Sequence, residues 1–390
     1  MVISNQKKDQ IKRYPFQKSW RWHLVRLFDF ICERFLRSRQ GVLFPNLVRN
    51  ILVIRLDQIG DLICALPVFP VLRMRFPNAR ITVLTGREGA SIFKGNPFID
   101  HILVFESNWF SKSKVVSLFE LFRVVSQLRK IRYDLGFDFR GDLRNILLMA
   151  FAGVLYRVGY GIAGGERLLH RMGDYQTNLH QVELNVRLVT DEAIDKCYLK
   201  PDLYLSPGER KEGLELLKRF GISHQARLIA VHPEAGYPSK EWGEASFKEL
   251  IAKLTEAQEN TVLILGLSKA AQLAESFVSS SQVINLTGKL SLREMIAVLS
   301  WCHLFLGNDS GPSHIAQALG IPAVVVASGT NEYEKWGIWR EPSKIAKHAV
   351  PCSPCHLRNC NVEGHPCMSE IKVDEVFRFG EELLTAAVRL

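Results

Sequence analysis

Short apolar runs bounded by polar turns recur along most of this 390-residue chain. In the first half, four runs have the length and pattern of buried strands: Ile51–Ile54, Arg80–Thr85, His101–Phe105 and Tyr133–Asp138. Longer segments with helical spacing lie between them, such as Val115–Ile131. Strands that alternate with helices predict parallel βαβ units, so we expect an α/β fold with a doubly wound sheet. The other elements expected here are helices over Leu62–Leu72 and Asn145–Leu155, an edge strand over Arg157–Gly161, and a loop over Gly161–Arg171.

A second series of the same kind begins after the polar stretch Ser206–Glu209, which predicts a domain junction. Its expected strands are Leu228–His232, Thr261–Gly266, Val283–Leu286, Leu304–Gly307 and Ile321–Ala327. We therefore expect four parts: a basic extension over residues 1–45, a first doubly wound domain over 46–205, a second over 206–370, and a C-terminal helix over 371–390.

The N-terminal extension changes character at Pro15. Apolar residues then recur at helical spacing among lysines and arginines, namely Trp20, Leu24, Leu27, Phe28, Ile31 and Phe35. Such a basic amphipathic helix can lie on an anionic bilayer, with its aromatic face inserted and its cations near the headgroups. A helix packed on the globular body is the alternative. No uncharged apolar core follows the basic start, which argues against a signal peptide.

Composition narrows the class of protein. Hydrophobic residues make up 47% of the chain, which excludes extensive disorder, and the net charge of +10 favours an anionic partner. The longest apolar runs, such as Ile146–Tyr156, are shorter than the roughly 18 residues of a membrane span. Eight cysteines in a chain of this length do not indicate a secreted disulfide scaffold, so we expect a cytoplasmic protein. No known nucleic-acid motif occurs, and we expect no nucleic-acid partner.

Polar residues follow the first expected strand, at the edge where open α/β sheets bind ligands. Arg55 directly follows Ile54 and Asp57 comes two residues later, and Gly60 allows a turn before Asp61 at the start of the next helix. A carboxylate is therefore expected at the edge of the sheet where a ligand would lie. The alternative is that Asp61 only caps the helix.

A second candidate site is the polar turn that follows the fourth strand of the second series. This turn supplies Asp309, Ser310 and Gly311 and leads into a helix, whose N-terminal N–H groups and dipole suit a phosphate. Lys240 follows another strand of the same sheet, so both could meet at one crevice. Each signal is weak alone, because such turns are usually only turns and His314 could be an ordinary helix residue. No Walker A motif is present, and no Gly-x-Gly-x-x-Gly follows the first strand, which argues against a dehydrogenase.

Three motifs, in this order along the chain, resemble those of the ADP-heptose:lipopolysaccharide heptosyltransferases, glycosyltransferase family 9. They are Arg55-Leu-Asp-Gln-Ile-Gly-Asp61 with Pro67 and Leu72-Arg-Met-Arg-Phe-Pro77; His232-Pro-Glu-Ala-Gly with Lys240-Glu-Trp242; and Gly307-Asn-Asp-Ser-Gly-Pro-Ser-His314 with Ala318-Leu-Gly-Ile-Pro322. The resemblance covers about residues 50 to 380. The combination is specific for the family, though not for one substrate.

The resemblance implies the GT-B fold, in which two Rossmann-like domains face each other across a cleft. The acceptor would lie mainly on the domain over 46–205 and the donor nucleotide-sugar on the domain over 206–370. The family's reaction inverts the anomeric centre and needs no metal. In GT-B proteins a C-terminal helix, here expected over Val373–Val388, often crosses back to the first domain.

Carried over residue by residue, the resemblance assigns roles to the candidate positions. Asp61 matches the catalytic base, with Asp57 as the reserve candidate, and Arg55 could pair with an acceptor phosphate or carboxylate. Lys240 matches the lysine on the donor phosphates. The donor-binding turn is matched by Asp309, Ser310, Gly311 and His314.

These matches predict a glycosyltransferase that moves a sugar, with heptose as the first candidate, from a nucleotide-sugar to a lipid-linked, lipopolysaccharide-type or other cell-envelope glycan. It would work without a cofactor, as a peripheral protein at the inner face of the cytoplasmic membrane. Many family members place acidic residues that reach the nucleotide ribose after the glycine that is Gly266 here. This chain instead continues Leu267-Ser-Lys-Ala-Ala-Gln, with the first acid at Glu275. Two alternatives stay open: a family member that uses another nucleotide-sugar, and a nucleotide- or glycan-binding protein without turnover.

Four cysteines gather near the C-terminus: Cys352, Cys355, Cys360 and Cys367. Thiols at this density could hold a structural zinc ion, although their spacing matches no common zinc finger closely. Reduced thiols or a local disulfide are the alternatives. Similar cysteine-rich tails occur in some members of the resembled family, without a metal in the chemistry.

Overall fold

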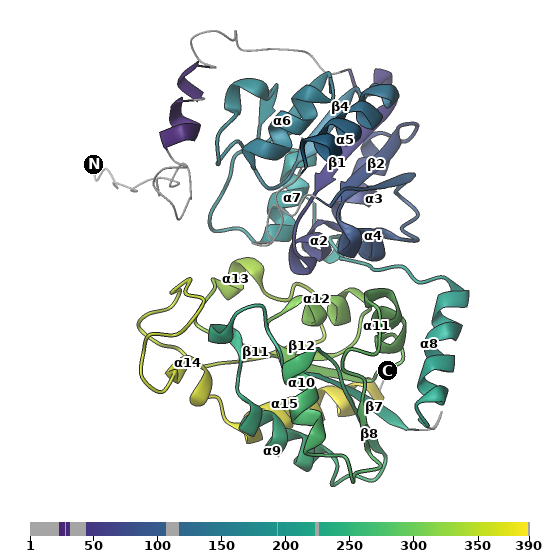
Figure 1. Cartoon of the computed structure of the whole chain (residues 1–390), viewed down its shortest axis with the longest axis vertical. Helices are drawn as coiled ribbons and strands as arrows, with labels where there is room; N and C mark the ends of the chain where they lie inside the picture. The colour runs from purple at the N-terminus through teal and green to yellow at the C-terminus, as the bar shows by residue number, and fades with distance from the viewer. Residues whose placement is uncertain are drawn as a thin grey trace.

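The computed structural model describes residues 23–27, 29–31, 44–106, 117–192, 194–222 and 226–388. Most of them form two lobes, each built on a parallel sheet of six strands, and the lobes lie one above the other in Figure 1. This arrangement confirms the predicted α/β class and the two facing, Rossmann-like sheets of the GT-B fold.

The sheet of the first lobe has the strand order β3-β2-β1-β4-β5-β6. Its strands are β1 (Asn50–Arg55), β2 (Arg80–Thr85), β3 (His101–Val104), β4 (Leu135–Asp138), β5 (Tyr156–Gly159) and β6 (Arg171–Met172). Side chains alternate along β1, so that Ile51 and Val53 join one hydrophobic core and Leu52 and Ile54 another. Because β1 is buried on both faces, its sequence is a continuous apolar run.

The sheet of the second lobe repeats this plan with the order β12-β11-β10-β7-β8-β9. Its strands are β7 (Arg227–His232), β8 (Asn260–Ile264), β9 (Val283–Asn285), β10 (Leu304–Asn308), β11 (Ala323–Ala327) and β12 (Ser343–Lys347). In both sheets the first strand in sequence, β1 or β7, lies at the centre beside the point where the strand order reverses. Open α/β sheets bind their ligands at the carboxyl ends of the strands at this point.

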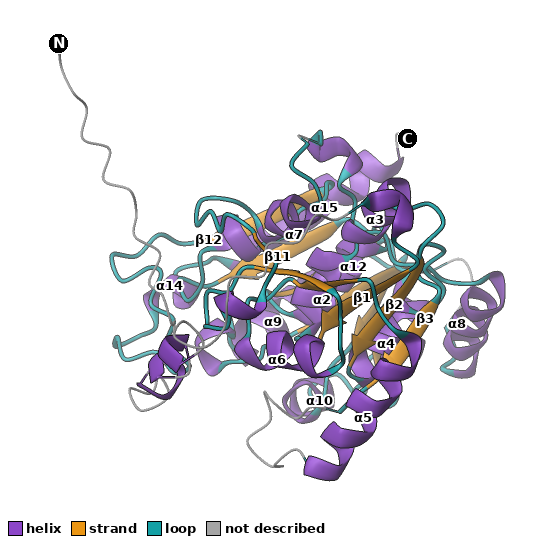
Figure 2. Ribbon diagram, turned by 90° about the horizontal axis from the view of Figure 1, so that it is seen from above, coloured by secondary structure: helices purple, strands orange, loops and turns teal. Residues whose placement is uncertain are grey.

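Helices cover both faces of each sheet (Figure 2). The first lobe contains η1 (Pro45–Leu47), α2 (Ile59–Ala65), α3 (Val68–Arg75), α4 (Arg87–Phe93), α5 (Leu118–Ile131), α6 (Leu143–Phe151), η2 (Glu166–Leu168), α7 (Gln181–Val189) and η3 (Lys196–Tyr198). Next come α8 (Pro207–Arg219), η4 (Pro238–Lys240), α9 (Glu244–Leu254), α10 (Ser268–Glu275), α11 (Leu292–Leu299), α12 (Gly311–Ala318), α13 (Tyr333–Trp336), α14 (Pro366–Ser369) and α15 (Val373–Val388).

Several elements differ from the sequence prediction. The helix expected over Leu62–Leu72 is divided into α2 and α3, because Pro67 has no N–H to continue the hydrogen-bond ladder. Helix α6 ends earlier than predicted, and two residues later Gly153 adopts a positive φ of 75°. The apolar pattern also did not predict β6, which has only two residues, or the polar edge strand β12.

The C-terminal helix has the predicted bounds but not the predicted course. Helix α15 packs against α9 and against β10, β11 and β12 of the second sheet. Its apolar side chains, among them Val376, Leu383 and Leu384, belong to the core of the second lobe. The expectation that this helix crosses back to the first lobe is therefore wrong.

The two lobes meet directly at the carboxyl ends of their central strands. Helix α2, which follows β1, contacts helix α12, which follows β10 (Figure 1). The approach is close at two glycines: a Cβ on Gly60 would lie 3.2 Å from the His314 ring, and one on Gly311 would lie 3.0 Å from Ile59 Cβ. The residues that follow β1 and β10 are thereby brought face to face.

Part of the predicted N-terminal helix lies within the described residues, since 23–27 and 29–31 are helical. Asp29 accepts a hydrogen bond from the Gly165 N–H at 2.8 Å, which attaches this segment to the loop after β5. Leu24, Leu27 and Ile31 are about half exposed, at 56%, 56% and 46%. The predicted face residues Trp20, Phe28 and Phe35 lie outside the described residues. None of the helices that the structure describes is long and apolar enough to cross a bilayer.

Candidate active site

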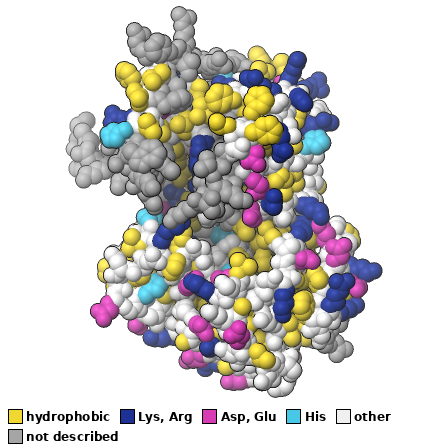
Figure 3. Space-filling model, viewed as in Figure 1, with side chains coloured by type: hydrophobic (Ala, Val, Ile, Leu, Met, Phe, Trp, Pro, Cys, Tyr) yellow, Lys and Arg dark blue, Asp and Glu magenta, His cyan; other side chains and the backbone are white. Residues whose placement is uncertain are grey.

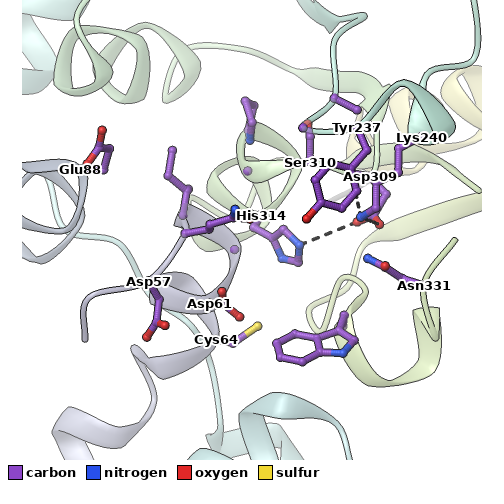
Figure 4. A pocket seen from close by; sticks show the side chains of 18 of the residues that line it. Asp57, Asp61, Cys64, Glu88, Tyr237, Lys240, Asp309, Ser310, His314 and Asn331 are labelled. Atoms are coloured by element: carbon purple, nitrogen blue, oxygen red, sulfur yellow. Dashed lines mark hydrogen bonds and ion pairs between the residues drawn. The ribbon is translucent and has the colours of Figure 1, made fainter. Parts of the chain in front are cut away.

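A cavity of about 620 Å³ opens between the two lobes and contains most of the predicted site residues. From the first lobe it is lined by Asp57 and Asp61. From the second lobe it is lined by Lys240, Asp309, Ser310, Gly311 and His314 (Figure 4). Asp57 and His314, which are 257 positions apart in the chain, thus share one cavity, because both sheets direct their central carboxyl ends toward it.

Asp61 lies in the first turn of α2, whose N-cap residue is Gln58 rather than Asp61. Figure 4 shows its carboxyl group close to Cys64 and on the side of the cavity reached by the His314 ring. Burial, followed by repulsion from Asp57, raises the pKa of Asp61 to about 6, against the opposing effects of Arg55, Arg140 and the Gln58 N–H. The carboxyl group can therefore exchange a proton near neutral pH, as a general base must.

Asp57 has a different environment, because two arginines bind it. The Arg55 Nη1 lies 3.1 Å from one of its carboxylate oxygens, and Arg140 forms an ion pair with the other. The Asp57 side chain is only 1% exposed. In Figure 4 its carboxylate points away from the side of the cavity that holds Lys240. Both carboxylate oxygens of Asp57 are therefore engaged in ion pairs.

Arg55 does not line the cavity, although the sequence suggested an acceptor contact for it. Its side chain is 2% exposed, and its Nη2 donates to the Asp61 carbonyl at 2.5 Å. Its guanidinium also lies 5.9 Å from the centre of the Phe139 ring. Arg55 thus connects the end of β1 to the first turn of α2 and helps to fix the position of Asp61 through its backbone carbonyl.

Arg140, which does not line the cavity but pairs with Asp57 beside it, was missed by the sequence analysis. It follows β4, and the loop that carries it is held by Asp138, which accepts hydrogen bonds from the N–H groups of Arg140 and Asp142 at 3.2 and 2.9 Å. Asn145 Nδ2 donates to the same carboxyl group at 2.9 Å. The signal available in the sequence was an Asp-x-Arg pattern at the end of a central strand, the same edge that carries Asp61.

On the second lobe, Lys240 and Asp309 form an ion pair across two loops. Lys240 Nζ lies 2.7 Å from Asp309 Oδ2, and the two side chains are 13% and 9% exposed. A lysine ammonium has three donors, so this contact leaves Lys240 able to bind a further anion. The sequence placed the two residues after different strands, and the structure confirms that they meet.

Ser310 and Gly311 form the N-terminus of α12 at the cavity wall. Ser310 is the N-cap residue and Gly311 begins the helix. The Ser313 hydroxyl donates to the Ser310 carbonyl at 2.6 Å, which fixes the turn. Because Ser310, Gly311 and Pro312 all line the cavity, the positive end of the helix dipole faces it. A phosphate placed there would be stabilised.

His314 bridges the two halves of the site. Its Nε2 lies 3.9 Å from Asp309 Oδ1, while its ring packs against Gly60 of the first lobe. Burial lowers the pKa of His314, and Lys240 lowers it further against the opposing effect of Asp309. The imidazole is therefore neutral at neutral pH and offers a hydrogen bond rather than a charge.

Other cavity residues were also missed by the sequence analysis: Glu88, Glu234, Tyr237, Asn331 and Trp336. Glu88 lies in the first turn of α4, which follows β2. Glu234 and Tyr237 lie in the loop after β7, Asn331 lies in the loop after β11, and Trp336 ends α13. Polar and aromatic residues in loops carry no periodic pattern, so only their position after a strand could have indicated them.

The C-terminal cysteines remain separate thiols. Cys352, Cys355, Cys360 and Cys367 are all free. Within the part of the chain that the structure describes, no group of three or more His, Cys, Asp or Glu side chains is arranged to hold a metal ion. The described residues therefore give no support to the zinc hypothesis.

Comparison with known proteins identifies the family. The family model "Glycosyltransferase family 9 (heptosyltransferase)" matches residues 121–365, which is more than half of the chain. Lipooligosaccharide heptosyltransferase 2 of Campylobacter jejuni is 23% identical over 333 residues, covering 84% of this chain and 95% of that protein. Lipopolysaccharide heptosyltransferase 2 of Escherichia coli K12 is 24% identical over 297 residues, covering 71% and 82%.

Solved structures show the same fold. The E. coli ADP-heptose lps heptosyltransferase II has a TM-score of 0.71 at 21% identity, covering 87% of this chain and 99% of that one. A family 9 glycosyltransferase from Veillonella parvula has a TM-score of 0.75 at 19% identity, covering 89% and 100%. The motifs, the two facing sheets and the family match agree: this chain belongs to glycosyltransferase family 9 and is a glycosyltransferase.

Proposed function

We propose that this enzyme transfers a sugar from a nucleoside-diphosphate donor to a lipopolysaccharide-type or other lipid-linked cell-envelope glycan. ADP-heptose is the first donor to test, because the heptosyltransferases named above are similar to this chain over most of its length. The observation that carries the proposal is the shared cavity, in which a carboxyl group from one lobe lies opposite a lysine and a helix N-terminus from the other.

In the proposed mechanism Asp61 acts as the catalytic base. It takes the proton from an acceptor hydroxyl as that oxygen attacks the anomeric carbon of the donor. The new glycosidic bond forms while the bond from the anomeric carbon to the diphosphate oxygen breaks, so the configuration inverts. A pKa of about 6 leaves Asp61 mostly ionised at neutral pH and still basic enough to accept the proton.

Asp57 is the weaker candidate for this role. Its carboxylate is already bound by Arg55 and Arg140, so it would have to give up an ion pair to accept a proton. We assign Asp57 a positioning role instead: it holds the two arginines in place, and its charge helps to raise the pKa of Asp61.

The second lobe would stabilise the leaving group. The diphosphate gains negative charge as the bond to the sugar breaks, and Lys240 with the N-terminus of α12 supplies positive potential where that charge develops. His314 would donate a hydrogen bond to the same group. These groups can replace the divalent ion that other phosphate chemistry uses, so we propose a metal-independent reaction.

We propose that the enzyme acts at the inner face of the cytoplasmic membrane, where a lipid-linked acceptor would lie. Leu24, Leu27, Phe30 and Ile31 are 46–65% exposed on the N-terminal helical segment. Figure 3 shows hydrophobic side chains intermingled with lysine and arginine on the near face of the upper lobe. We propose that this segment binds anionic lipid. Removal of residues 1–40 should release the protein from phosphatidylglycerol vesicles, and unchanged co-sedimentation would contradict the proposal.

One assay tests the transfer itself. The protein is incubated with a panel of nucleotide-sugars and a cell-envelope glycan extract, and the products are examined by mass spectrometry for an added sugar. We expect a heptose increment with ADP-heptose, unchanged by a metal chelator. A different sugar increment would indicate another donor. Binding of a nucleotide-sugar without any product would support the alternative of a non-catalytic binding protein.

A further inference from the structure

Glu234 joins two loops at the carboxyl end of the second sheet. It follows β7, but its side chain extends to the loop after β8, where one carboxylate oxygen accepts from the Leu267 N–H at 2.8 Å. The other oxygen accepts from the Ala270 N–H at 2.9 Å, in the first turn of α10. The carboxylate also lies beside Gly266, where an added Cβ would be 3.1 Å from Glu234 Oε2.

This position matters because of the strand order. Strands β7 and β8 are the first and second strands of a Rossmann-type sheet. In such sheets phosphate lies near the turn after the first strand, and an acidic side chain at the end of the second strand binds the ribose hydroxyls. After β8 this chain has no acidic residue before Glu275, which is the last residue of α10. Glu234 instead brings a carboxylate to that place from the neighbouring loop.

Glu234 can bind a ligand as well as hold α10. It lines the same cavity as Lys240, and its side chain is half-buried. An ionised carboxylate has about four acceptor positions, of which the two N–H groups occupy two. The remaining positions can accept from two neighbouring hydroxyl groups, and the N–H contacts keep the carboxylate in a fixed orientation for them.

We propose that Glu234 binds the ribose hydroxyls of the donor nucleotide and thereby selects ribonucleotides. The inference rests on the proposed nucleotide-sugar donor and names a specificity-determining residue for it. The competing explanation is that Glu234 only attaches α10 to the loop after β7, which would affect stability but not the choice of sugar in the nucleotide.

Glu241 provides a matched control. It lies in the same loop after β7 and also attaches α10, because Lys269 Nζ lies 2.8 and 2.7 Å from its two carboxylate oxygens. Unlike Glu234, it does not line the cavity. A Glu241→Gln variant therefore loosens the same helix without removing a carboxylate from the nucleotide site.

The experiment compares dissociation constants for ADP, 2′-deoxy-ADP and 2′,3′-dideoxy-ADP by isothermal titration calorimetry, with the uridine and guanosine series measured in parallel. The original protein should bind its preferred ribonucleotide at least about tenfold more tightly than the dideoxy analogue, since hydrogen bonds to a charged group are lost. Glu234→Ala should reduce that ratio to about one to twofold, while Glu241→Gln keeps it.

Each outcome is decisive. If Glu234→Ala weakens all nucleotides equally and leaves the ratio unchanged, Glu234 is only a helix attachment. If Glu234→Ala does not fold, Glu234→Gln replaces it, and at least a threefold fall in the ratio is then required. If the original protein binds ADP and 2′,3′-dideoxy-ADP equally well, and likewise in the other two series, the role of Glu234 is refuted but the proposed donor is not. A protein that binds no nucleoside diphosphate overturns the proposed donor as well.

Discussion

The two lobes give the cavity two walls with different electrostatic environments: the first wall carries Asp61, and the second carries Lys240. In the first lobe, Arg55 and Arg140 both pair with Asp57, and among the described residues no cation lies within ion-pair distance of Asp61. In the second lobe, Lys240 pairs with Asp309, and a helix N-terminus adds positive potential beside it. The first lobe therefore holds a carboxyl group whose pKa is raised, while the second lobe holds a cation in a fixed position.

This difference shows how one fold can provide two chemistries. Both walls are built from the same element, a turn between a central parallel strand and a helix. What separates them is the partner that each charged group receives. Burial and an acidic neighbour raise the pKa of Asp61, whereas Lys240 forms an ion pair with Asp309 that holds its ammonium group in place. Replacing single groups on either wall tests the comparison.

Removal of the carboxyl group from the first wall should have the largest effect. Asp61→Asn should lower kcat about 10²–10⁴-fold, because no base remains to accept the acceptor proton. The native structure raises the pKa of Asp61, so it holds the ionised form less favourably than the unfolded chain does. The melting temperature at pH 7.5 should therefore stay the same or rise. Full turnover by a folded Asp61→Asn protein would refute the assignment.

Removal of the cation from the second wall should have the next largest effect. Lys240→Ala should lower kcat about 10²–10³-fold, because the leaving diphosphate loses a charge that acts mainly in the transition state. It also leaves Asp309 buried without its partner, so thermal unfolding must be measured alongside. The double variant Lys240→Ala, Asp309→Asn removes both charges. If it regains stability but not activity, loss of the cation is the cause.

The sequence predicted the fold through its buried strands. A strand covered on both faces carries a continuous apolar run, Ile51–Ile54 in β1 and Leu304–Leu306 in β10, and the polar residues after that run stand out. That contrast located Asp61 and the turn at Asp309. Lys240 was found by the same rule, since it lies in the loop after β7. The resemblance to a family then supplied roles that spacing alone could not.

The remaining features depend on contacts between distant segments, which no local pattern encodes. The ion pair of Arg140 with Asp57 joins loops after β4 and β1, and the contact of Glu234 with α10 joins loops after β7 and β8. Arg55 looked available for a ligand because the sequence does not reveal its burial. The division of the chain at residue 206 into functional domains stays a prediction.

The pH dependence of activity reports on the first wall directly. The base must be ionised to work, so kcat/KM should fall below pH 6 and approach a tenfold loss per pH unit, with a plateau above about pH 7. Initial rates between pH 5 and 8 at constant ionic strength test this. A flat profile down to pH 5 would mean that Asp61 is not the titrating base.

The smallest expected effect is a shift of that acid limb when Arg140 is replaced. Arg140 lowers the pKa of Asp61 by its charge, so Arg140→Met should raise that pKa and move the acid limb of kcat/KM to higher pH by a fraction of a unit. A loss caused only by disturbed folding would lower the rate equally at every pH. Arg144→Met is the control, because Arg144 pairs with Asp142 at 2.6 Å instead of Asp57. If the acid limb of kcat/KM does not move in Arg140→Met, Arg140 affects Asp57 but not the pKa of Asp61. The difference between the two lobes would then depend on the burial of Asp61 rather than on the distribution of charge around it.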